Sequence, residues 1–268
     1  MKIAKPVRDY RKLRPGNLGS DEFKHLKLLL FWPIFGLVFL FVERFYPVTD
    51  YYSVFCALDS YIPFNEFFLI PYLFWFVFLA GIHVYTALYD IEAFKKLMKF
   101  IIITYSIAVL VYLIFPTCQN LRPETFSRDN IFTRFLTWFY KFDTNTNVCP
   151  SIHVIGSVAA AITVWNTDRL RTVFQKTAAA VIALFICAST LFLKQHSILD
   201  IVFAIPVCVI GYYFSFLDIN KKQRIGNFFR KIFHRAPDKE AEKGRPEELY
   251  SVASKSYHDY GGVNGSSK

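Results

Sequence analysis

Residues 26–45 read LKLLLFWPIFGLVFLFVERF, and this apolar run decides the fold class. A helix needs about 20 apolar residues to cross the hydrocarbon core of a bilayer. The run meets that length, and its charged residues stay close to its two ends. It therefore predicts a membrane-spanning helix.

Five further apolar runs follow, at about Phe67–Tyr89, Phe100–Phe115, Ser151–Trp165, Thr177–Leu193 and Ile198–Leu217. The run at 151–165 is short, but its polar first turn suits the membrane interface. Isolated strands cannot satisfy their backbone in lipid, and no alternating barrel pattern is present. The sequence predicts an all-α integral membrane protein with six transmembrane helices in residues 26–217. A basic N-terminal tail, 1–25, and a basic, largely disordered C-terminal tail, 218–268, flank this bundle.

Composition supports a membrane protein and argues against other classes. Hydrophobic residues make up 54% of the chain and charged residues 19%, whereas soluble domains carry about 25% charged residues. The net charge is +10, but the basic residues gather in the tails and at segment ends, so nucleic acid is not an expected partner. No C-x-x-C pair is present, so neither a metal nor another cofactor is expected. Cys118 and Cys149 bracket one loop and could form a disulfide.

The distribution of Lys and Arg predicts the orientation. Most of these 31 residues lie in the two tails and in the second and fourth connections. Because basic residues favour the cytoplasmic side, both termini are expected in the cytoplasm and the protein in the cell membrane. The connections 46–66, 116–150 and 194–197 would then face outward.

Two amphipathic segments are expected at the membrane surface. Ile131–Phe142 (IFTRFLTWFYKF) has an apolar face and interfacial aromatic residues, and Ile225–Arg235 (IGNFFRKIFHR) is basic. A helix end packed on the bundle is the alternative for each.

The first of three outward-facing polar patches is FPTCQNLRP, which ends in Arg122 and Pro123. The planar fork of a guanidinium suits phosphate oxygens. The alternative for Arg122 is an interfacial side chain that reaches toward lipid headgroups.

The second patch, CPSIH, opens the run at 151–165. Pro and then Ser151 before an apolar run predict a helix start, whose free N–H groups can bind phosphate. His153 in the first turn could donate a proton to a leaving oxygen. A capped helix with an interfacial His is the alternative.

The third patch is KQHSILD, from Lys194 to Asp200. His196 and Asp200 are four residues apart and share one helix face. A carboxylate bonded to one imidazole nitrogen leaves the other nitrogen free to attack. A structural His–Asp pair at a helix end is the alternative.

Together the patches supply the groups needed for attack by histidine on phosphorus. A metal-binding Asp/Glu cluster does not accompany them in the sequence, so a metal-free mechanism is expected.

In this order, the patches resemble the three motifs of the type 2 phosphatidic acid phosphatase superfamily, K-x6-R-P, P-S-G-H and S-R-x5-H-x3-D. The matching positions here are Arg122-Pro123, Pro150-Ser151-Ile152-His153, and Ser189, His196 and Asp200. The resemblance covers roughly residues 25–218 and implies six transmembrane helices.

The resemblance also implies the role of each site residue. His196 is the nucleophile, Asp200 orients it and His153 protonates the leaving group. Ser151 and Arg122 bind phosphate oxygens.

Two positions depart from the family pattern. Phe115 stands where the family has Lys, and Thr190 stands where it has Arg. Lys194 could supply one of the missing charges to the substrate. FPTCQNLRP, PSIH and LKQHSILD also look like the branch of inositol phosphorylceramide and sphingomyelin synthases, which transfer a phospho-headgroup between lipids. A diester donor carries less charge than a phosphomonoester and would need fewer cations.

The chain is therefore expected to be an enzyme, a lipid phosphatase that acts through a phosphohistidine at the outer face of the membrane. Its expected partners are membrane lipids and a lipid phosphate substrate. Headgroup transfer is the first alternative. A non-catalytic lipid-binding or transport protein with a degenerate site is the second.

Overall fold

The protein is described from a computed structural model over residues 5–233. The chain divides into two units, Met1–Leu217 and Asp218–Lys268. The second unit contains α8 (Ile219–Phe233), which extends the amphipathic segment expected from residue 225. The disordered tail expected beyond this helix lies outside the described residues.

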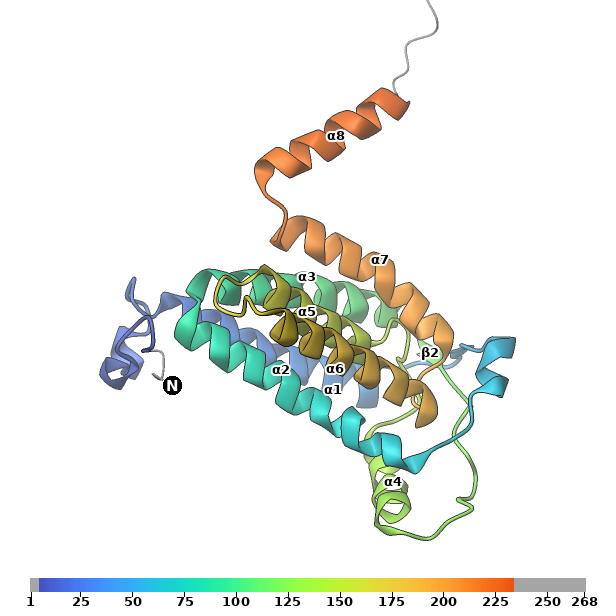
Figure 1. Cartoon of the computed structure of the whole chain (residues 1–268). Helices are drawn as coiled ribbons and strands as arrows, with labels where there is room; N and C mark the ends of the chain where they lie inside the picture. Colours follow the sequence, from blue (N-terminus) through green and yellow to red (C-terminus); the bar gives the residue numbers. More distant parts are fainter. Residues whose placement is uncertain (1–4, 234–268) are drawn as a thin grey trace, which may run out of the picture. The chain divides into compact units, whose positions relative to one another are not determined.

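The first unit is built almost wholly from helices (Figure 1). Its α-helices are α1 (Phe31–Arg44), α2 (Leu69–Tyr89), α3 (Ile91–Ile114), α4 (Ile131–Phe142), α5 (Ile152–Asn166), α6 (Val173–Phe192) and α7 (Ile198–Ser215). Short 3-10 helices include η3 (Lys24–Leu30) before α1, η4 (Ala57–Tyr61), and η5 (Glu66–Phe68) before α2.

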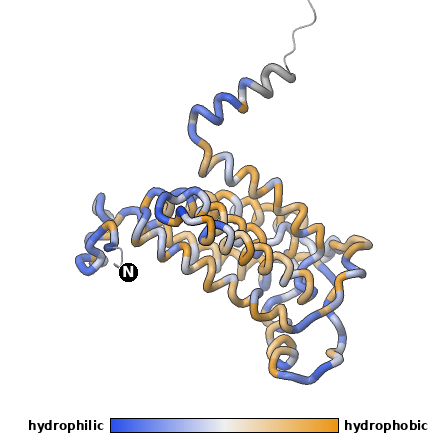
Figure 2. The backbone as a smooth tube through the Cα atoms, in the orientation of Figure 1, coloured by the Kyte–Doolittle hydropathy of each residue, from blue (hydrophilic) through white to orange (hydrophobic). Residues whose placement is uncertain are grey.

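Five helical stretches of the described chain are long and apolar enough to cross a membrane. They are Lys24–Arg44, Glu66–Tyr89, Ile91–Ile114, Val173–Phe192 and Ile198–Ser215. The fourth expected span, predicted at Ser151–Trp165, forms a shorter apolar helix, Ile152–Asn166. Hydrophobic residues dominate these helices, whereas the N-terminal segment and the loop beside α4 are largely hydrophilic (Figure 2).

Helix α5 is central to the bundle, since it contacts α2, α3, α6 and α7. Its small residues allow this close packing. A Cβ at Gly156 would lie 2.7 Å from Tyr105 Oη and 2.9 Å from Trp75 Nε1. The helix is thus enclosed by protein, which explains how a short helix can be buried among longer ones.

Helix α1 is packed much less tightly. Val42 is its one buried residue, while Ile34, Leu37 and Phe41 are exposed. Contact with the bundle is largely aromatic, and the ring of Phe35 lies 4.9 Å from that of Tyr105. Most of the α1 surface is therefore available to lipid.

Loops at one end of the bundle are tied together by short backbone pairings. Strand β1 (Tyr52–Ser53) pairs in parallel with β2 (Thr117–Cys118), and Cys118 forms a bridge with Thr146. Helix α4 has the bounds expected from the sequence, with Leu136 and Phe139 buried. Cys118 and Cys149 are free thiols.

The start of the third long helix differs from the expectation. Helix α3 begins at Ile91 rather than near Phe100, because Asp90 caps its N-terminus and accepts a 3.0 Å hydrogen bond from Ala93 N. The basic residues that were expected in a connection therefore lie in the first turns of a helix.

Candidate active site

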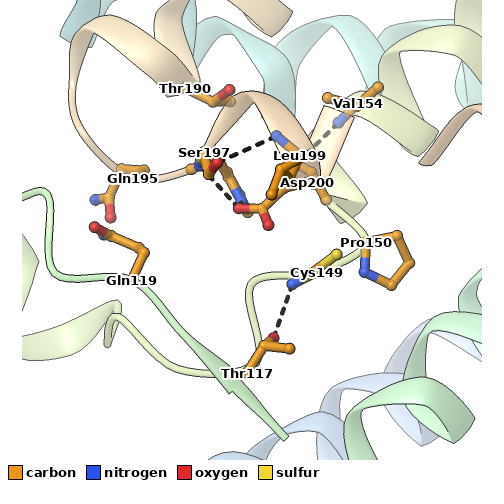
Figure 3. A network of polar contacts seen from close by, with 12 residues as sticks. Thr117, Gln119, Cys149, Pro150, Val154, Thr190, Gln195, Ser197, Leu199 and Asp200 are labelled. Atoms are coloured by element: carbon orange, nitrogen blue, oxygen red, sulfur yellow. Dashed lines mark hydrogen bonds and ion pairs between the residues drawn. The ribbon is translucent and has the colours of Figure 1, made fainter. Parts of the chain in front are cut away.

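His196 lies in the turn before α7 and Asp200 lies in its first turn, so the two residues pair across the start of the helix rather than along one helix face. His196 Nδ1 lies 2.9 Å from Asp200 Oδ2, and the same oxygen accepts a 3.0 Å bond from Ser197 N. Both side chains are buried. Because the carboxylate faces Nδ1, Nε2 is the nitrogen left to act on a substrate. Figure 3 shows Asp200 beside Ser197 in this polar network.

The start of α7 is held by a carboxylate from far along the chain. Asp59 Oδ2 accepts a 2.6 Å bond from Ser197 Oγ, and Oδ1 accepts a 2.8 Å bond from Ile198 N. Burial opposes ionisation of Asp59, but hydrogen bonds from Ser197, Ile198 and Cys56 outweigh it and lower its pKa. This side chain therefore fixes the turn that carries the His–Asp pair.

Lys194 also bonds to Asp59. Its Nζ donates a 2.9 Å bond to the backbone carbonyl of Asp59. Burial lowers the pKa of Lys194, while the Asp59 charge opposes that shift. The amine is thus engaged by the loop before α2, and Lys194 is not among the residues that line the cavity at His196.

The second histidine, His153, lies in the first turn of α5. Its ring centroid is 5.7 Å from that of His196. Tyr72 and Trp75 pack against it with centroid separations of 4.5 and 4.6 Å. The packing fixes the plane of the ring, and its buried Nδ1 has no hydrogen-bond partner among the described residues.

Ser151 caps α5, as the sequence predicted, and its backbone links the starts of α5 and α7. Its Oγ accepts a 3.4 Å bond from Val154 N, and its own N donates a 3.2 Å bond to Asp200 O. Ser151 is fully buried. Its hydroxyl serves the helix terminus rather than the cavity.

A small polar cavity of about 30 Å³, here called the polar chamber, lies between the two histidines. Its lining includes two carboxylates that the sequence analysis did not select, Glu43 and Asp143. Glu43 accepts bonds from Thr146 Oγ1 at 2.7 Å and Asn147 Nδ2 at 3.2 Å. These bonds hold Glu43 against the loop before α5.

Asp143 accepts a 2.8 Å bond from Tyr72 Oη, and burial raises the pKa of this carboxyl. Two other chamber residues keep unpaired buried atoms, Oδ1 of Asn147 and Nε2 of Gln195. A buried polar atom without a partner is costly. The chamber thus offers both an acceptor and a donor to a polar ligand.

Arg122 lies next to the chamber but is engaged by protein oxygens. Its guanidinium donates to the carbonyls of Tyr140, Asp143 and Thr144, and to the side chain of Gln195. Burial lowers the pKa of Arg122, and the Asp143 charge opposes the shift. The reason for this placement is the C-terminal end of α4, whose free carbonyls attract a cation.

A larger, mainly apolar groove meets the chamber. It has a volume of about 570 Å³ and lies along α1 and α2, with two rings of α4 at one end. Phe39, Asp143, Ile152 and His153 line both spaces. The site therefore joins a polar cavity to an apolar groove.

The structure brings some of the predicted site residues together and places others apart. His196, Asp200 and His153 form one cluster, and Ser151 joins it through its backbone. Arg122 contacts the cluster through Gln195, and Lys194 turns to Asp59. In residues 5–233, no three His, Cys, Asp or Glu side chains are grouped to hold a metal ion.

Glu43 carried a signal in the sequence, because an acidic residue inside an apolar run is costly in lipid. Asp143 carried a weaker signal, as it directly follows the amphipathic segment.

The cluster of His196, Asp200 and His153 has a clear chemical capability. It offers one imidazole whose Nε2 is free and whose Nδ1 faces a carboxylate, and a second imidazole on the other side of the polar chamber.

Comparison of the chain with models of known protein families, with curated proteins and with solved structures gives no match.

Proposed function

We propose that the protein is a membrane lipid phosphatase that acts through a phosphohistidine intermediate and needs no metal. The observation that supports this most directly is the pairing of His196 with Asp200 opposite His153. A nucleophile, its orienting acid and a proton donor are the three parts of such a reaction.

In the first step, His196 Nε2 attacks phosphorus and a P–N bond forms. The bond from phosphorus to the ester oxygen breaks, and protonated His153 gives its proton to that oxygen. In the second step, water attacks phosphorus and passes a proton to His153 while the P–N bond breaks. Inorganic phosphate leaves, and both histidines return to their starting states.

The placement in the membrane is part of the proposal. With α5 as a sixth, shorter crossing beside the five long apolar helices, the Lys and Arg bias supports both termini in the cytoplasm and the chamber at the outer face of the cell membrane. The resemblance to the type 2 phosphatidic acid phosphatases supports the same arrangement.

A second candidate function is transfer of a phospho-headgroup to an acceptor alcohol. It is favoured by the carboxylates Glu43 and Asp143 in the chamber and by the engagement of Arg122 with protein oxygens. A phosphomonoester dianion would meet like charge there, whereas a diester carries one negative charge less. A lipid-binding protein with a degenerate site is a third candidate, supported by Phe115 and Thr190 at the positions of two family cations.

The test is release of inorganic phosphate by detergent-purified protein from a panel of lipid phosphates, with EDTA present. Wild type is compared with His196→Ala, and gel filtration checks that both are folded. Release that survives EDTA and is lost in the variant is the expected result.

Absence of release from every monoester would refute the phosphatase. Diester donors with alcohol acceptors then test transfer. Inactivity with all donors would leave the lipid-binding candidate.

A further inference from the structure

The apolar groove beside the chamber has the dimensions of one lipid chain. Along α1 and the preceding η3 its lining runs from Phe39 to Leu29, and on α2 from Tyr72 to Val84. At 1.5 Å per helical residue, these stretches are about 15 and 18 Å long. One leaflet of a bilayer core is about 15 Å deep.

The direction of the groove fits a lipid whose phosphate is at the histidines. His153 and Asp143 lie at the Phe39 end, where the groove meets the polar chamber. Trp32, Phe35 and Leu79 continue the lining away from that end. A chain that extends from a phosphate at His196 would therefore enter the groove directly.

One polar side chain, His83, lies among the apolar residues at the far end of the groove. His83 lines it with Nε2 buried and unpaired among the described residues, while Nδ1 lies 2.7 Å from Leu79 O. The residues that line the groove extend no further than Leu29 on one side and Val84 on the other, so the groove covers a chain of limited length.

We propose that this groove binds one hydrocarbon chain of the lipid substrate and sets the preferred chain length. The proposal rests on the phosphatase or transferase function proposed above, since it places the phosphate at His196. Packing explains why the groove exists, because α1 buries only Val42 and leaves space between itself and α2.

Gly36 provides the test. It lines the groove, and a Cβ built on it meets no atom within 4 Å. A phenylalanine at this position would extend into open groove space and shorten it. Gly81 on α2 also has open space around a Cβ but is not part of the lining. Gly81→Phe is therefore the matched control.

The first measurement compares octyl phosphate with hexadecyl phosphate as substrates. Gly36→Phe should lose about tenfold or more in kcat/KM on the long chain, while the short chain is turned over as by wild type. Gly81→Phe should match wild type on both. An unchanged ratio in Gly36→Phe, or the same ratio change in both variants, would overturn the proposal.

The second measurement does not depend on turnover. A hexadecyl phosphate that carries a photoreactive diazirine on the chain is irradiated with the intact protein in detergent, and the labelled peptides are mapped. The expected result is labelling of the peptides of α1 and α2. Unlabelled hexadecyl phosphate should compete with this labelling, and Gly36→Phe should reduce it. That result supports the groove even if no phosphate is released. Phosphate release together with labelling of other peptides would refute the groove as the chain-binding site and would leave the proposed phosphatase function intact.

Discussion

Asp59 accepts a 2.6 Å hydrogen bond from the hydroxyl of Ser197, although the two residues are 138 positions apart in the chain. Ser197 is the neighbour of His196, and its backbone N donates to Asp200. A loop between two spans thereby holds the turn that carries the proposed nucleophile.

Asp59→Asn should lower stability and activity together at neutral pH. The pKa of Asp59 is lowered in the folded protein, so the ionised carboxylate stabilises the fold. This stabilisation is fully present above the ordinary pKa of 3.8, and it is lost as the pH falls through the pKa of Asp59 in the folded protein. A loss of about 1–3 kcal/mol is expected at neutral pH. Thermal unfolding of the detergent-solubilised variant, followed against pH, checks this. Asp50→Asn, at an exposed site of the same loop, is the control, and a difference from wild type that persists at acid pH would contradict the argument.

Asp200→Asn should reduce kcat much more than it changes KM. An amide can present its NH2 group to Nδ1 and so favour the wrong tautomer, as happens when the triad aspartate of serine proteases is replaced. A fall in kcat of roughly 10³-fold or more is expected by that analogy. Steady-state kinetics with any accepted lipid measures it. Retention of wild-type kcat would remove Asp200 from the proposed mechanism.

Arg122→Lys separates a structural role from direct phosphate binding. The structure gives the guanidinium several oxygen partners at the end of α4, and a single ammonium cannot serve them all. The expected result is a lower unfolding temperature, from about 1–3 kcal/mol of unpaired carbonyls. An unchanged unfolding temperature with a raised KM would instead support the phosphate contact that the motif implies.

Gly156→Ala should destabilise the bundle near His153. The added methyl would press on Tyr105 and on Trp75, whose indole packs against the His153 ring. Overpacking of this kind costs about 1–3 kcal/mol. Thermal unfolding and kcat are measured beside Gly81→Ala, which has open space around the new methyl. Equal unfolding temperatures for the two variants would show that the packing adapts.

The sequence predicted the helices well because apolar length is a local property. It also placed the His196–Asp200 pair and the Ser151 cap, since both depend on neighbours within four residues. It did not predict the partners of Lys194 and Arg122. Those partners belong to loops distant in the chain, and charge type alone does not tell a phosphate oxygen from a backbone carbonyl.

Glu43 and Asp143 were missed for a related reason. Neither acid belongs to a phosphate-binding pattern, so their positions in the sequence do not connect them with the histidines. Both acids line the polar chamber because α1 and the loop after α4 meet there in the folded protein.

The bond from Ser151 N to Asp200 O joins the first turn of α5 to the first turn of α7. His153 lies in the first turn of α5, and His196 lies two residues before α7 begins at Ile198. A displacement of either helix start would therefore move the other as well, so this bond helps to keep the separation of the two imidazoles constant. In the proposed enzyme, lipid would exchange along the loosely packed α1 while the two imidazoles stay at the same distance from each other.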